Sequence, residues 1–256
     1  MKSFNESEIK YLAGLLDADG SLSFKFCKSS SGKTFVYLIL GLTASVKIDR
    51  AGYLRSLGER CGSTCEVTYE KETFSDAMSW KVQKRSEVNM MLDRLVKHMV
   101  VKGKHWKNLQ DIFNAMKGVD ITDYIDILKE YSYESRKQSG PIKPKSHLTW
   151  AWAAGYLDGD GCYTCSKVKH LGCITHKDDL DGIRLLHKAF GGTIYPERVQ
   201  DNTVLWRVGL GTSNSALAKR ILPKLHKHSR LKKWKIEQLL SFHNQPHRLS
   251  EIKSTD

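Results

Sequence analysis

The feature that most constrains this chain is a short apolar stretch that ends in two acids and occurs twice. The first copy is YLAGLLDADG at residues 11–20, and the second is AAGYLDGDG at residues 153–161. Each copy predicts an apolar helix whose last acid stands directly before a glycine. Acid at this end of a helix is unfavourable, because the helix dipole is already negative there. A chain that repeats the arrangement must use it for something other than stability.

The segments that follow the two motifs have the same order of expected elements, which predicts a tandem repeat. Each half shows an alternating hairpin, a helix that stops at glycine, a second hairpin and two helices. These segments are 21–47, 49–62, 63–83, 86–99 and 103–116 in the first half, and 162–177, 178–192, 193–209, 214–225 and 231–243 in the second. We therefore predict an α+β fold of two pseudo-symmetric αββαββα repeats, with the sheets forming a β-saddle and the two motif helices at the interface.

The stretch SYESRKQSGPIKPKSH, residues 132–147, combines Pro-x-x-Pro spacing with Ser and Gly and predicts an exposed linker. We accordingly expect an N-terminal repeat over residues 1–131 and a C-terminal repeat over residues 148–256. The 256 residues are enough for two compact domains, each with its own core.

Composition indicates the class of partner. Lys and Arg number 41 against 28 Asp and Glu, which gives a net charge of +13. Such a surplus favours a polyanionic partner, nucleic acid first and a membrane surface second. No stretch approaches the roughly 18 apolar residues that a membrane span requires. The first residues, MKSFNESEIK, lack the apolar core of a signal peptide, so we expect an intracellular protein that is not secreted.

The six cysteines are too few for a disulfide scaffold and favour a reducing compartment. Four residues of the second half, Cys162, Cys165, Cys173 and His176, have a C-x2-C-x7-C-x2-H spacing. That spacing can hold zinc. The same stretch also has the pattern of a two-stranded hairpin in which cysteine is only a small side chain, and both interpretations stay open at this point.

Small residues on the motif helices predict how the two copies meet. Gly14 and Ala18 are four apart and share one helical face, as do Gly155 and Gly159. Faces of this kind let two helix backbones approach closely. If the two motif helices pack against each other, their C-terminal ends meet.

The last acids of the motifs, Asp19 and Asp160, then converge. Two carboxylates about 5 Å apart repel by roughly 3 kcal/mol at an effective dielectric near 20. A divalent cation such as Mg²⁺, which takes hard oxygen ligands, reverses this cost. The alternative is that both acids are Asp-Gly turn residues. The other two acids, Asp17 and Asp158, we interpret as local hydrogen-bonding residues at the helix ends.

The motifs LAGLLDADG and AAGYLDGDG resemble the signature of the LAGLIDADG homing endonucleases in their single-chain form. The first has Leu16 where the signature has Ile, and the second is looser, with Ala153 and Tyr156 among the residues that replace its Leu. The resemblance implies a monomeric, intron-encoded enzyme that makes a double-strand break with 3′ overhangs in a long, asymmetric DNA target. It further implies Mg²⁺ bound by the last acid of each motif, Asp19 and Asp160. The backbone carbonyls of Ala18 and Gly159 would be additional ligands.

The resemblance also implies a basic catalytic residue near the end of each repeat. Aligning Trp106 with Trp234 sets VVKGKHW against HSRLKKW and pairs Lys102 with Arg230. We take these two as the candidates, although Lys232 is an alternative to Arg230. Either base could instead contact a phosphate.

Strand alternation predicts which side chains face DNA, since a two-stranded ribbon fits the major groove. The expected DNA-binding residues are Ser21, Ser23, Lys25, Thr64, Glu66, Thr68, Lys81, Gln83, Thr164, Ser166 and Arg207. The run KRILPKLHKHSRLKKWK at residues 219–235 is basic and has no acid, so we expect it to meet phosphates.

Two further functions are compatible with this pattern. An intron-encoded RNA-splicing maturase can share the fold and hold RNA on its surface. A DNA-binding regulator could use a degenerate version of it, but would normally have lost one or both acids. The intact acids of both motifs favour the nuclease.

Overall fold

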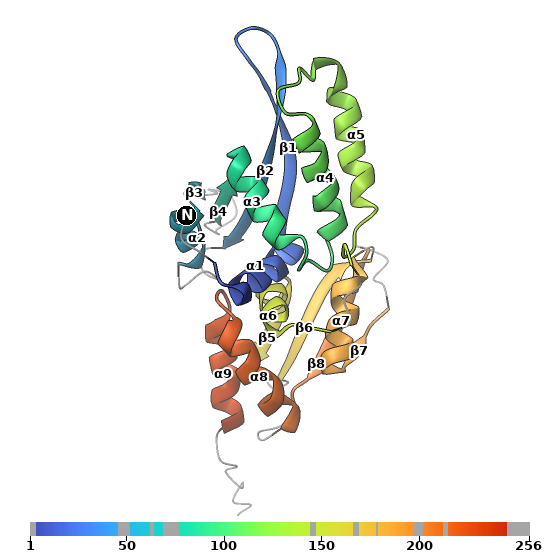
Figure 1. The fold of residues 1–256 in the computed structure, drawn as a ribbon. Coiled ribbons are helices and arrows are strands. Elements are labelled where there is room, and N and C mark those ends of the chain that lie inside the picture. Colours follow the sequence, from blue (N-terminus) through green and yellow to red (C-terminus); the bar gives the residue numbers. More distant parts are fainter. Residues whose placement is uncertain are drawn as a thin grey trace, which may run out of the picture.

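The computed structural model describes residues 4–45, 52–61, 64–68, 77–143, 147–165, 169–177, 179–196, 202–211 and 215–244, with backbone alone for 64–68. The same succession of elements occurs twice along the chain (Figure 1). The first repeat holds α1 (Glu6–Asp19), β1 (Gly20–Lys28), β2 (Thr34–Ser45), α2 (Tyr53–Cys61), β3 (Thr64–Thr68), β4 (Ala77–Val82), α3 (Arg85–Leu95), α4 (Gly103–Ala115), the 3-10 turn η1 (Thr122–Tyr124) and α5 (Ile125–Arg136). The second holds α6 (Trp150–Gly159), β5 (Gly161–Cys165), β6 (Lys169–His176), α7 (Leu180–Phe190), β7 (Thr193–Ile194), β8 (Thr203–Gly209), α8 (Ala216–His228) and α9 (Lys233–Asn244).

Each repeat contributes one four-stranded antiparallel sheet, and the two sheets have the same strand order. The first is β1-β2-β4-β3 and the second is β5-β6-β8-β7. Helices cover one face of each: α4 and α5 contact the first sheet, and α7 and α9 contact the second. Trp80 and Trp206 occupy equivalent positions in β4 and β8 and are fully buried. The α+β class and the repeat order predicted from the sequence are confirmed.

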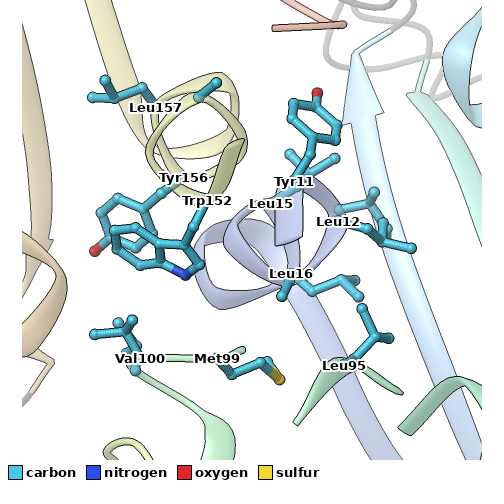
Figure 2. Close-up of a cluster of buried hydrophobic side chains, with 14 of the residues drawn as sticks. Tyr11, Leu12, Leu15, Leu16, Leu95, Met99, Val100, Trp152, Tyr156 and Leu157 are labelled. Atoms are coloured by element: carbon cyan, nitrogen blue, oxygen red, sulfur yellow. The ribbon is translucent and has the colours of Figure 1, made fainter. Parts of the chain in front are cut away.

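The two motif helices, α1 and α6, form the interface between the repeats. A methyl group at Gly14 would lie 2.0 Å from the carbonyl oxygen of Trp152, and one at Gly155 would lie 2.0 Å from that of Tyr11. The backbones therefore touch at these two glycines, as the small-residue faces predicted. Figure 2 shows the apolar and aromatic side chains that pack around this crossing, with Leu12, Leu15 and Leu16 on α1 and Trp152, Tyr156 and Leu157 on α6.

The helix α5 was not predicted, and it takes up the first residues of the stretch expected to be a linker. Its buried side chains are Leu128 and Ser135, and the Ser135 hydroxyl lies 2.5 Å from Nδ1 of His105 on α4. Exposed Ile127 and Tyr133 interrupt the apolar period that would have indicated a core helix. None of the helices in the described ranges is long and apolar enough to cross a bilayer.

Candidate functional site

The last acids of the two motifs lie together where α1 and α6 end. A methyl group built on Gly159 would lie 3.1 Å from Oδ2 of Asp19 and 2.4 Å from the side chain of Ala18. Asp19 is exposed and Asp160 is half-buried. Burial, together with the negative charge of Asp19, raises the pKa of Asp160 to about 7, against the opposing effect of Lys102 and Lys232. Desolvation of the Asp19 carboxyl by the surrounding protein also raises its pKa.

The carbonyl groups at the end of each motif helix accept hydrogen bonds from a lysine of the same repeat. Nζ of Lys102 donates to the carbonyl oxygens of Leu16, Ala18 and Gly20, at 3.2, 2.8 and 2.9 Å. Nζ of Lys232 makes the equivalent bonds to Leu157, Gly159 and Gly161, at 3.4, 2.5 and 2.7 Å. Burial lowers the pKa of both ammonium groups, while the nearby acids oppose that change. The two cations offset the negative ends of the helices, where the acids stand.

The pairing of Lys102 with Arg230 is wrong, because the structure places Lys232 in the equivalent position. The tryptophan alignment is two residues out of register. The backbone N–H of Trp106 donates to the carbonyl oxygen of Lys102, four residues earlier. The residue four after Lys232, which donates to the Lys232 carbonyl oxygen, is Ile236 and not Trp234. Both Trp106 and Ile236 are buried. Arg230 is exposed and contributes its backbone N–H to the site, in a 2.8 Å bond to Asp158.

The first acid of each motif makes long-range contacts, so the expectation of a local role was also wrong. Asp17 accepts from the backbone N–H groups of Val100 and Lys102, at 2.6 and 2.8 Å. Asp158 accepts from Ser229 Oγ and from the N–H groups of residues 230–232. Each acid therefore holds the loop that carries the lysine of its own repeat.

Each of these acids also accepts one bond from an aromatic side chain of the other repeat. Nε1 of Trp152 donates to Asp17 at 2.9 Å, and the hydroxyl of Tyr11 donates to Asp158 at 2.8 Å. Tyr11 and Trp152 each stand six residues before the first acid of their own motif. That repeated aromatic residue with a polar group was the sequence signal for this arrangement, and the sequence analysis missed it.

The oxygen groups at this site fit a hard divalent cation. Asp19 lies against Gly159, its charge acts on Asp160, and the carbonyl groups of Ala18 and Gly159 directly precede the two acids in the chain. Each carbonyl already accepts a lysine N–H bond, so a cation would use its second lone pair. Over the described ranges, no group of three or more His, Cys, Asp or Glu side chains could hold a metal ion. Among the described residues no further His, Cys, Asp or Glu joins them, and water or a bound substrate would complete the coordination.

The zinc interpretation is excluded, because Cys162, Cys165, Cys173 and His176 all lie within the described ranges and form no metal-binding group. In the β5–β6 ladder Cys162 is opposite Gly172, and Cys173 is opposite Gly161. Neighbouring residues of a strand point to opposite faces. Cys173 is buried in the core, whereas Cys162 is exposed on the other side. The hairpin interpretation holds.

The face of each sheet that the helices leave uncovered presents equivalent residues from the two repeats. In the first sheet Ser21 is opposite Gly41, which is opposite Lys81; in the second, Cys162 is opposite Gly172, which is opposite Arg207. We call this uncovered side the open face. Ser23, Lys25, Gln83 and Arg207 are exposed, and Thr164 and Lys81 are half-buried.

The other expected DNA-binding residues are less fully described. Thr64, Glu66 and Thr68 belong to β3, but their side chains lie outside the described residues, and so does Ser166. The expected contact of the basic run 219–235 with phosphates stays a prediction, and exposed Lys219, Arg220, Lys227 and Arg230 are the candidates for it. Lys232 is buried in the site, and Nζ of Lys224 lies 4.8 Å from the ring centre of Trp150.

Comparisons with known proteins show the fold. The crystal structure of I-SmaMI bound to uncleaved DNA with calcium ions is 15% identical, with a TM-score of 0.64 over 94% of this chain and 90% of that one. The LAGLIDADG homing endonuclease I-GzeII in complex with its DNA target is 15% identical, with a TM-score of 0.64 over 94% of this chain and 89% of that one. The LAGLIDADG meganuclease I-AabMI bound to uncleaved DNA is 14% identical, with a TM-score of 0.65 over 94% of this chain and 90% of that one. No family model and no curated protein matches the sequence.

Proposed function

We propose that this chain, which has the fold of the single-chain LAGLIDADG homing endonucleases, is a site-specific DNA endonuclease. It would make a metal-dependent double-strand break with 3′ overhangs in a long, asymmetric target. The observation that carries the proposal is the convergence of Asp19 and Asp160 at the ends of two tightly packed helices. Each helix end is held by its own lysine, half-buried Lys102 or buried Lys232.

Asp19 and Asp160 would hold Mg²⁺ together with the carbonyl oxygens of Ala18 and Gly159. When bound there, Mg²⁺ lowers the pKa of a water and offsets charge on the phosphate and the leaving oxygen. The fixed ammonium groups of Lys102 and Lys232 add positive charge beside the site without needing to move. Burial and the negative charge of Asp19 together raise the pKa of Asp160, and a cation bound between the two acids would offset both effects.

The open faces would bind the two halves of the target. An antiparallel ribbon fits the major groove, and Lys81 and Arg207 occupy equivalent positions in the two sheets. Because the two repeats differ in sequence, the two half-sites would differ as well, which gives an asymmetric target. The three similar structures described above were all solved with DNA, which supports this partner.

A randomised double-stranded DNA library, incubated with the protein and MgCl₂, tests the proposal. The cleaved ends are sequenced, and RNA binding is measured in parallel. We expect one long target family, cut on both strands, and binding that weakens steeply with salt as counterions are released. Binding of structured RNA with no cut in any library member would instead support a maturase and contradict the endonuclease.

A further inference from the structure

At one position close to the acids, the open face of the first sheet has a pair of hydroxyl side chains where the second sheet has an apolar pair. In the first sheet Thr43 on β2 is opposite Ser79 on β4, and their hydroxyl oxygens are 2.9 Å apart. In the second sheet the equivalent pair is Ile174 on β6 and Leu205 on β8. Each pair lies two residues beyond the equivalent glycines, Gly41 and Gly172, so the equivalence follows from the ladders alone.

The Ile174–Leu205 pair is apolar on a face that is otherwise largely polar. Ile174 is 45% exposed, and Leu205 is half-buried. The next pair outward along the same two strands is Gly172 with exposed Arg207. The exposed apolar surface is therefore continuous with the proposed DNA-binding surface.

The ladders also place this pair along the half-site. The β5–β6 ladder begins at Gly161 and Cys173, directly after the motif helix. Ile174 therefore lies nearer Asp160 than the Gly172–Arg207 pair does. On a bound duplex it would contact the base pairs of its half-site closest to the cleavage centre.

The major groove offers one apolar group that distinguishes the bases, the C5-methyl of thymine. An aliphatic side chain contacts that methyl group, whereas hydroxyl groups bond to donors or acceptors on any base; in the Thr43–Ser79 pair, the only apolar group is the single methyl of Thr43. Resting on the proposed endonuclease function, we propose that Ile174 and Leu205 bind the methyl group of a thymine at the inner end of the half-site contacted by residues 148–256. The Thr43–Ser79 pair, which has a single methyl group, makes a smaller contact of this kind in the other half-site.

The first test uses the target recovered from the randomised library, with binding measured in EDTA so that no cleavage occurs. The library should select thymine at the inner position of this half-site. Replacing that thymine by deoxyuridine removes only the methyl group, and should weaken binding roughly fourfold, the effect of one buried methyl group. The same replacement at the equivalent position of the other half-site should change binding less than about twofold. Replacing the thymine by cytosine should also weaken binding, and replacing it by 5-methylcytosine should weaken binding less, because the methyl group is restored.

The chain provides its own matched variants. Ile174→Thr combined with Leu205→Ser places the residues of the first sheet at this position of the second, and should reduce the difference between thymine and deoxyuridine to that of the other half-site. Thr43→Ile combined with Ser79→Leu should increase that difference in the other half-site. Circular dichroism and urea unfolding show that each double variant is folded before binding is compared.

The outcomes separate this inference from the proposed function. If the parent protein binds and cuts its target but selects no thymine there, or responds equally to deoxyuridine in both half-sites, the methyl contact is wrong and the endonuclease stands. If the protein cuts no DNA, the proposed function fails, and the inference fails with it.

Discussion

The hydroxyl of Tyr11 donates a 2.8 Å hydrogen bond to Asp158, which belongs to the other repeat. Burial raises the pKa of the Tyr11 hydroxyl well above its usual value, so it keeps its proton and acts as the donor. Trp152 makes the equivalent bond to Asp17 in the opposite direction. Because both acids also hold the lysine loops, the packing of the two repeats is linked to the position of Lys102 and Lys232.

Tyr11→Phe should lower the free energy of unfolding by about 1–3 kcal/mol, because it removes a buried donor to Asp158 without changing the ring. Urea unfolding followed by circular dichroism measures the change. Tyr37→Phe is the control, since Tyr37 is 45% exposed on the open face. Equal stability of the two variants would mean that the bond across the interface contributes nothing.

Lys232→Met should reduce single-turnover cleavage of the recovered target by about 100-fold or more, the usual effect of losing one fixed donor from an active site. Lys102→Met should act similarly, since its contacts are equivalent. Arg230→Met is the matched control and should reduce cleavage only slightly, because its side chain is exposed. A larger loss in Arg230→Met than in Lys232→Met would restore the pairing that the tryptophan alignment suggested.

The stability of the metal-free protein should fall as pH rises from about 4 to about 7. The folded state holds a proton on Asp160 up to a pKa of about 7, whereas the unfolded carboxyl releases it near 3.8. Unfolding therefore releases a proton in this window, which favours the unfolded state as pH increases. Asp160→Asn removes the effect and should raise the unfolding midpoint by a few degrees at pH 8, but hardly at pH 4.

Thermal unfolding in EDTA across this pH range measures the difference. Asp126→Asn is the control, because the Asp126 side chain is 94% exposed. If Asp160→Asn and the parent protein have the same pH profile, the pKa of Asp160 is not raised in the folded state.

Most of the repeat and the position of the acids could be predicted from the sequence, because both depend on local patterns. Alternation indicates strands, and the small faces at Gly14 and Gly155 indicate the helix contact. The role of Lys232 could not be found in this way. It depends on the number of residues that precede the lysine in its loop. The buried residue four positions after the lysine is Trp106 in the first repeat and Ile236 in the second, so matching tryptophans does not find it. The roles of Asp17 and Asp158 depend on partners in distant loops, which spacing along one helix cannot indicate.

The half-site bound by the first repeat should extend further from the cleavage centre than the other. The β1–β2 hairpin runs from Gly20 to Ser45, whereas β5–β6 runs only from Gly161 to His176, and Figure 1 shows the first projecting well beyond the rest of its sheet. A longer ribbon contacts more base edges, each discriminating by about 1–3 kcal/mol. Single-base substitutions across the target measure this reach. Equal sensitivity at both outer ends would show that hairpin length does not determine it.

Cleavage of the recovered target by Asp19→Asn and by Asp160→Asn tests the central claim most directly. Each variant is incubated with MgCl₂ beside the parent protein and Asp126→Asn, and binding is measured on the same DNA in EDTA. We predict that neither active-site variant makes a double-strand break, while both bind within a fewfold of the parent and Asp126→Asn cuts normally. Double-strand cleavage at the parent rate by either variant would contradict the assignment of the two acids.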